Sequence, residues 1–172
     1  MFITFRLLYM ESHLGLDAAA AVGAVATGVT IYTVTSMVAS LLAGWLSDLL
    51  GRRKILVAAS ILVFGLASYL LLHADTVGAF YVVEAVMGVA YGVYIAVDLA
   101  LVLEVLPDRE QAGKDMGVFN IANALPQSHA PAFGGFLLAS LGGGTDFAAL
   151  LLAALACAVI GAVMTMCIRG VK

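Results

Sequence analysis

Two long stretches of this chain contain no Asp, Glu, Lys or Arg. The first runs over thirty residues, from Ala18 to Ser47, and the second covers Ile55 to Ala74. Of all residues, 63% are hydrophobic and only 11% are charged, whereas soluble domains carry about 25% charged residues. A chain of 172 residues cannot hide that much apolar surface in a water-soluble core. The sequence therefore predicts an all-α integral membrane protein surrounded by lipid.

The apolar runs predict six membrane-spanning helices. A span needs about 20 apolar residues, and the runs are continuous rather than alternating as barrel strands do. The first run is too short to cross alone, so we interpret it as part of a helix whose beginning is missing. The fourth run is longer than the hydrocarbon core requires, so its helix should tilt or protrude. It contains Glu84, Asp98 and Glu104. The predicted spans cover residues 1–16 (truncated), 19–46, 55–74, 77–106, 116–141 and 147–168.

The basic residues predict the orientation of these spans, because cytoplasmic loops are enriched in lysine and arginine. With six spans, seven of the eight Lys and Arg residues fall on one side, within residues 52–54, 109–114 and 169–172. The opposite loops carry acids and histidines but no lysine or arginine. We therefore predict a multi-pass protein of the plasma or inner membrane with a cytoplasmic C-terminus.

Several functional classes find no support in the sequence. The net charge is only −3 and no basic stripe is present, so nucleic acid is not a predicted partner. No nucleotide-binding loop or nucleophile motif predicts an enzyme. Cys157 and Cys167 lie ten residues apart in one predicted span, too far for a disulfide, and no Cys/His cluster has metal-ligand spacing. We predict no metal and no cofactor, and the expected partners are the lipid bilayer and a small-molecule solute.

One short polar stretch, GWLSDLLGRRK at residues 44–54, interrupts the apolar sequence. Gly51 suits a turn with positive φ, and Gly44 ends a row of small residues that would allow close helix packing. Asp48 lies near a helix C-terminus, where the helix dipole disfavours an acid, so it should need a compensating partner. Its basic residues can bind carboxylates or lipid phosphates; they are Arg52, Arg53 and Lys54.

This stretch resembles the signature of the major facilitator superfamily, G-x-L-[SA]-D-x-x-G-R-[RK]-[RK], which lies at a cytoplasmic turn between two spans. The matching residues are Gly44, Leu46, Ser47, Asp48, Gly51, Arg52, Arg53 and Lys54. The resemblance implies a charge latch that forms in one conformational state. The alternative is that the basic residues only set the membrane topology.

A second stretch resembles a more specific group of transporters. The pattern G-V-x-N-x-x-x-x-x-P-Q resembles the eleventh span of sucrose transporters and their glycoside–pentoside–hexuronide relatives; its residues are Gly117, Val118, Asn120, Pro126 and Gln127. The resemblance implies the C-terminal six-helix half of a major facilitator bundle, which would pair with an N-terminal half or with a second copy of itself. In this chain alone, Asp48 would then contact only local groups such as Arg52 or Arg53.

Charged residues inside spans are costly and tend to face a cavity or a partner. Glu84, Tyr91 and Asp98 recur every seven residues, so they share one helix face, and Tyr91 could line a substrate cavity. Either carboxylate could bind the coupling proton. The alternatives are that Glu84 lies near the outer headgroups and that Asp98 pairs with a base elsewhere. On a neighbouring face, G-x-x-x-G at residues 88–92 predicts close helix packing.

The fifth predicted span carries a row of amides at Asn120, Asn123 and Gln127. These side chains could hydrogen-bond sugar hydroxyls in a cavity, or they could bond a neighbouring helix. Pro126 and Pro131 lack a backbone donor and should kink the helix. His129, on the same span, could titrate or simply bond a neighbouring group.

Arg6 is the one basic residue within an apolar run. It could snorkel to the interface, bind an anionic substrate or pair with Glu11. Together, these features predict a secondary transporter driven by a proton or other cation gradient, with a sugar or glycoside as the preferred solute. Drug or metabolite efflux is the alternative within this class, and a truncated, non-transporting fragment that needs a partner half is a further one.

Overall fold

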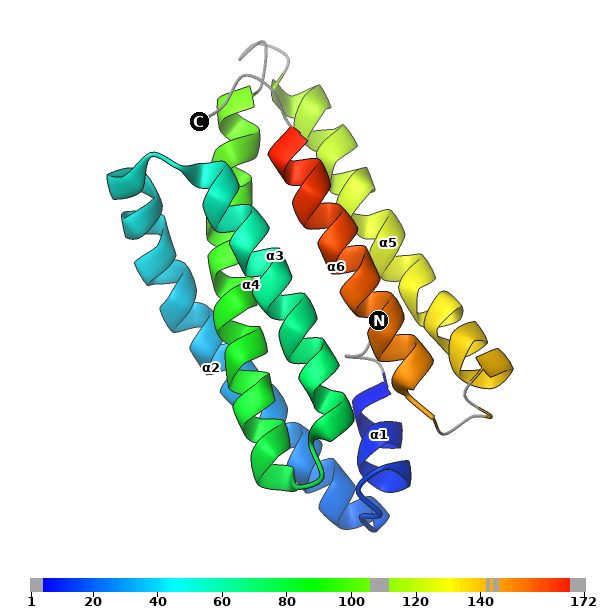
Figure 1. The fold of residues 1–172 in the computed structure, drawn as a ribbon. Helices are drawn as coiled ribbons and strands as arrows, with labels where there is room; N and C mark the ends of the chain where they lie inside the picture. The colour runs from blue at the N-terminus through cyan, green and yellow to red at the C-terminus, as the bar shows by residue number, and fades with distance from the viewer. Residues whose placement is uncertain (1–4, 106–111, 142, 144–145, 168–172) are drawn as a thin grey trace.

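The computed structural model describes residues 5–105, 112–141, 143 and 146–167, and these residues form helices joined by short connections. The elements are α1 (Arg6–Ser12), α2 (Ala18–Leu50), α3 (Arg53–Leu70), the 3₁₀ helix η2 (Leu71–His73), α4 (Val77–Val105), α5 (Ala112–Leu141) and α6 (Ala148–Cys167). Figure 1 shows the five long helices side by side in a bundle, with the short α1 near one end. The predicted all-α class is confirmed for the described residues.

Local capping defines several helix ends. Asp17 Oδ1 accepts a hydrogen bond from Ala20 N (2.7 Å) at the start of α2, and Asp146 Oδ1 accepts one from Ala148 N (2.8 Å) at the start of α6. Between α1 and α2, Gly15 adopts φ +65°, which a residue with a side chain rarely tolerates. This turn follows α1, whose described helical residues are Arg6–Ser12. The predicted span 1–16 includes residues 1–4, which lie outside the described residues, and it stays a prediction.

Four helices in the described part of the chain are long and apolar enough to cross a membrane. They cover Ala18–Leu50, Arg53–His73, Val77–Leu101 and Ala148–Cys167. Large apolar side chains on α2 point outward, with Leu41 77% and Trp45 70% exposed, as expected where lipid replaces water. Helix α5 is long but less apolar than α4 or α6, and α1 is short. That these two helices also span the membrane stays a prediction.

Helix α4 packs along α2 and against α3, and α3 also packs against α6. The contact between α2 and α4 is especially close, because a Cβ at Gly92 would clash with the Ser36 carbonyl oxygen and one at Gly88 with Tyr32 and Thr35. The close packing predicted from G-x-x-x-G is therefore confirmed, with α2 as the partner. At Gly44, by contrast, an added Cβ would meet no described atom within 4 Å, so the predicted close approach there is wrong.

The buried apolar side chains form two clusters. The larger one gathers α1, the end of α3, the start of α4 and the start of α6, and its bulkiest members include Tyr9, Phe80 and Met87. The smaller one lies near the polar turn and consists of Ala43, Val57, Val97 and Leu101. Residues 88–96 of α4 therefore lie between the two clusters, and they carry two tyrosines.

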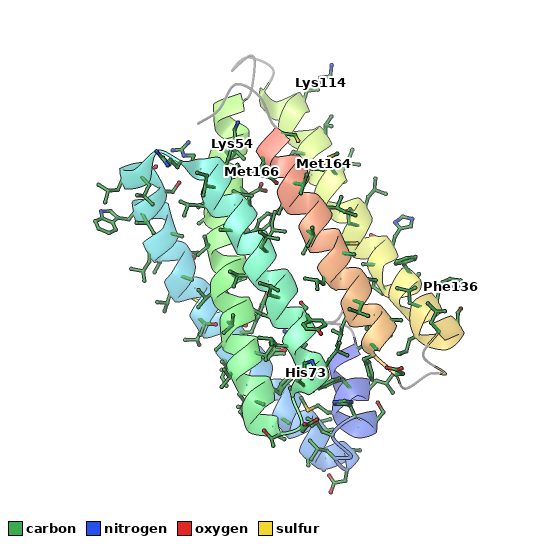
Figure 2. All side chains as sticks on the ribbon, in the orientation of Figure 1. Lys54, His73, Lys114, Phe136, Met164 and Met166 are labelled. Carbon is green, nitrogen blue, oxygen red and sulfur yellow. The ribbon has the colours of Figure 1, made fainter. Side chains whose placement is uncertain are left out.

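Basic residues at the starts of α3 and α5 lie at the same end of the bundle. Figure 2 places Lys54 and Lys114 there, whereas His73 lies toward the opposite end. This arrangement agrees with the predicted gathering of bases on one side. Arg109, Arg169 and Lys172 lie outside the described residues, and the cytoplasmic location of this end stays a prediction.

Candidate functional site

A buried ion pair joins α1 to α4. Arg6 Nε donates a hydrogen bond to Glu84 Oε1 (2.7 Å) and Arg6 Nη2 donates one to Oε2 (2.5 Å). Arg6 is 3% exposed and Glu84 is 0% exposed. Two parallel hydrogen bonds between a guanidinium and a carboxylate form a strong and directional contact. The pair therefore fixes α1 against α4 across 78 positions of sequence.

This pair corrects three of the predictions. Arg6 does not snorkel, because it is buried, and it does not pair with Glu11, which is exposed. It does not lie free for an anionic substrate either, because its donors bind Glu84. Glu84 is buried inside the bundle, and its depth relative to the headgroups stays a prediction. The sequence alternatives for Arg6 failed because the true partner comes from a distant helix.

A row of tyrosine rings leads from this pair to Asp98. The guanidinium carbon of Arg6 lies 5.2 Å from the ring centroid of Tyr32. The rings of Tyr32 and Tyr91 are 5.7 Å apart, and those of Tyr91 and Tyr94 are 6.5 Å apart. Asp98 lies four positions after Tyr94, one helical turn further along α4, so the two side chains are neighbours on one helix face. The predicted residues Glu84, Tyr91 and Asp98 are thus connected through two tyrosines that the sequence analysis did not select.

An open cavity of about 490 Å³ lies beside this row, between α3, α4, α5 and α6; we call it the aromatic cavity. Its lining is mostly apolar, with hydroxyl and thiol groups from a few residues. The lining residues are Ser60, Ile61, Phe64, Ala90, Tyr91, Tyr94, Pro126, Ala154, Cys157 and Ala158. Its volume lies within the range of about 300–1,000 Å³ that small-molecule sites occupy.

The polar turn between α2 and α3 is held together locally. Asp48 Oδ1 accepts a hydrogen bond from Arg53 Nη2 (3.0 Å), and Arg53 Nη1 donates to the carbonyl oxygen of Ala100 on α4 (3.2 Å). The predicted local partner of Asp48 is therefore confirmed among the described residues. Arg52 lies at the start of α3 and is exposed. Because Asp48 is 73% exposed at its side chain, this pair contributes little stability.

Gly51 ends α2 in the left-handed conformation, with φ +59°, as the sequence predicted. Its N–H donates to the Ser47 carbonyl oxygen (3.0 Å). An added Cβ would meet no described atom within 4 Å, so only the backbone conformation disfavours a side chain here.

We expect the Gly51→Ala change to lower the free energy of unfolding by about 1 kcal/mol, because alanine is strained at positive φ. Gly51→Asn should cost less, since asparagine tolerates this region better. Titration with sodium dodecyl sulfate, followed by circular dichroism, measures the effect. Gly44→Ala, within α2 and with open space around it, is the control and should not destabilise.

The amide row of α5 lies apart from the aromatic cavity. Asn120 and Gln127 are exposed and Asn123 is half-buried, and none of the three lines the aromatic cavity. Helix α5 continues through Pro126 and Pro131 without interruption, and the predicted kink stays a prediction. His129 Nδ1 lies 2.9 Å from the Leu125 carbonyl oxygen of its own helix, which agrees with the interpretation of a local bond.

The family of the chain follows from its similarity over nearly the whole length. The family model described as the Major Facilitator Superfamily matches residues 1–171. The chain belongs to the major facilitator superfamily. The polar turn that resembles the signature of this superfamily holds an ion pair between Asp48 and Arg53 in the structure.

Curated relatives from this superfamily match part of the chain. The uncharacterized MFS-type transporter YfiU of Bacillus subtilis (strain 168) is 29% identical over 111 residues, which are 64% of this chain and 21% of that protein. The uncharacterized MFS-type transporter Rv1877 of Mycobacterium tuberculosis (strain H37Rv) is 33% identical over 109 residues, which are 63% of this chain and 16% of that protein. The matched region thus spans about a fifth or less of these relatives. No solved structure matches the chain.

Proposed function

We propose that the chain forms the C-terminal six-helix half of a secondary transporter that moves a small solute by alternating access. Membership in the superfamily supports transport, and the pattern from Gly117 to Gln127 supports the C-terminal half. The second half of the working unit would be an N-terminal half or a second copy of the chain. In this proposal the Asp48–Arg53 contact is the latch of one conformational state, because it ties the turn to α4 through Ala100.

The observation that carries coupling to protons is the position of Asp98. This carboxylate is half-buried on an apolar helix, one helical turn from Tyr94, whose side chain lines the aromatic cavity. A carboxylate inside a membrane is stable either when neutral or when a cation lies nearby. Asp98 is therefore the preferred site for the coupling proton, and Tyr94 connects it to the solute.

Glu84 is the second candidate for coupling, and its geometry suggests a different route. While Arg6 is bound, the carboxylate has a compensating charge and needs no proton. If α1 moves away from α4 during transport, Glu84 remains inside the bundle without that charge and takes up a proton instead. Protonation of Glu84 would thus be linked to the separation of α1 and α4.

The aromatic cavity favours a solute with an apolar, ring-containing body, as in the drug or metabolite alternative. A sugar needs several polar groups that converge on its hydroxyls, and the amides of α5 do not line this cavity. Sugar or glycoside transport remains the competing proposal, and it requires Asn120, Asn123 and Gln127 to reach a solute site outside the aromatic cavity.

The Asp98→Asn change tests proton coupling in proteoliposomes with an imposed proton gradient. We expect gradient-driven accumulation of the solute to fall to the level of protein-free liposomes. Exchange of labelled for unlabelled solute should continue, because exchange requires no net proton movement. Glu11→Gln, which removes an exposed carboxylate, is the control and should accumulate solute normally. Undiminished accumulation by Asp98→Asn would show that Asp98 is not the coupling site.

A parallel comparison in the same vesicles separates the solute classes. Uptake of an apolar aromatic compound without sucrose uptake supports the drug or metabolite class, and the reverse result supports the sugar or glycoside class.

The mass of the purified chain in detergent, measured by light scattering, tests whether the chain pairs with a second copy of itself. A monomer that transports neither solute would favour the alternative of a fragment that needs another half.

A further inference from the structure

We propose that the aromatic cavity binds an organic cation that carries aromatic rings. This inference deepens the transport function proposed above and rests on it for the role of the cavity, but binding can be measured without transport. The proposed function describes the solute as apolar and ring-containing, and this inference specifies that the solute also carries a positive charge. Three features of the described residues support it: the aromatic rings, the nearby charges and the apolar lining of the cavity.

The rings supply a surface that attracts cations. Tyr91 and Tyr94 both line the cavity, with centroids 6.5 Å apart, and Phe64 lines it from α3. The face of an aromatic ring is electron-rich and attracts a cation at about 6 Å or less from its centroid. The same molecule already shows this contact once, where the Arg6 guanidinium lies over Tyr32.

The charges near the cavity do not balance. Arg6 and Glu84 neutralise each other in their ion pair. Asp98 lies one helical turn from the cavity-lining Tyr94, and no ion pair to Asp98 is found among the described residues. When Asp98 is ionised, one negative charge therefore remains on α4 near the cavity. In a medium of low polarity this charge favours a cation in the cavity and disfavours an anion.

The apolar lining of the cavity selects for a solute with an apolar body. Four helices contribute to its walls, and Ile61, Ala90 and Ala158 form apolar parts of the lining. A small hydrated cation would lose its water there without finding carboxylate or carbonyl ligands. A cation whose charge is spread over aromatic rings loses less hydration and fills more of the space.

Tetraphenylphosphonium and tetraphenylborate are suitable probes, because they share four phenyl rings and a similar shape but carry opposite charges. Binding of each radiolabelled ion to the purified full chain is measured by equilibrium dialysis, with protein-free detergent as background. We expect the cation to bind at least about tenfold more tightly than the anion. Asp98→Asn should reduce this preference by about tenfold, because it removes the negative charge.

Substitutions on α6 locate the bound probe. Cys157 lines the aromatic cavity, and Cys167 lies on the same helix beside a different hollow. Cys157→Phe should fill the aromatic cavity and abolish specific binding of tetraphenylphosphonium, whereas Cys167→Phe should leave it unchanged. Tyr91→Leu should weaken binding by about tenfold, and Tyr69→Leu, outside the cavity, should have no effect. Circular dichroism confirms that each variant is folded.

The outcomes separate this inference from the proposed function. Equal binding of the two ions, or equal binding by the Cys157→Phe and Cys167→Phe variants, overturns the cation site even if the chain transports another solute. Selective binding that depends on Tyr91 and Asp98 supports the site even if proteoliposomes show no proton-driven uptake, and in that case only the transport proposal fails.

Discussion

Replacing Arg6 by leucine is expected to lower the free energy of unfolding by roughly 3–5 kcal/mol. The change removes the guanidinium but leaves Glu84, which is 0% exposed, inside the bundle without a compensating charge. A carboxylate in that position must either keep an uncompensated charge or take up a proton, and both are costly. Unfolding with sodium dodecyl sulfate, followed by circular dichroism, measures the loss.

The double change Arg6→Leu and Glu84→Leu distinguishes an uncompensated charge from lost packing. Because it removes both charges, it should restore most of the stability lost in the single variant. Asp48→Leu supplies a control, because it breaks an ion pair whose carboxylate is 73% exposed at its side chain, and it should change stability by only about 0–1 kcal/mol through loss of that pair. A double variant as unstable as Arg6→Leu would show that packing, not charge, dominates at this position.

The Gly92→Ala change is expected to lower the free energy of unfolding by roughly 3 kcal/mol, at the upper end for an overpacked interior. The added methyl group would meet the carbonyl oxygen of Ser36, which is a backbone atom. Side chains can rotate away from a clash, but a helix backbone can relieve it only if α2 and α4 move apart. The same sodium dodecyl sulfate titration measures this loss.

Gly23→Ala is the matched control for this contact. Gly23 also lies within a membrane-length helix, α2, but an added Cβ there would meet no described atom within 4 Å. Alanine is the better helix former by about 1 kcal/mol, so the control should be neutral or slightly stabilising. If Gly92→Ala behaved like Gly23→Ala, the close approach of α2 and α4 would be contradicted.

The features that the sequence predicted correctly are those that depend on nearby residues. Long apolar runs form helices because every backbone group in lipid needs an internal partner. Gly51 adopts positive φ, and Asp48 pairs with Arg53 five positions away. The close packing at Gly88 and Gly92 also followed from the spacing of small residues, although only the structure identifies α2 as the partner.

The features that the sequence did not reveal depend on contacts between distant helices. No spacing rule connects Arg6 with Glu84 or places Tyr32 between Arg6 and Tyr91, because these residues meet only when α1, α2 and α4 pack together. Tyr94 was detectable in principle, since it lies four positions before Asp98 on the same helix. The spacing of the amides correctly predicted that they lie on one helix, α5. It could not show that they lie apart from the aromatic cavity.

The sparse packing of α5 has a mechanical consequence. Among the described residues, helices α2, α3, α4 and α6 form extensive contacts within the bundle, whereas the main contact of α5 is a limited one with α6. Pro126 nevertheless places α5 in the wall of the aromatic cavity. Displacing α5 would therefore break fewer contacts than displacing any other wall, and the cavity would widen on that side first. Of the helices that line the aromatic cavity, α5 is therefore the one that can move most easily.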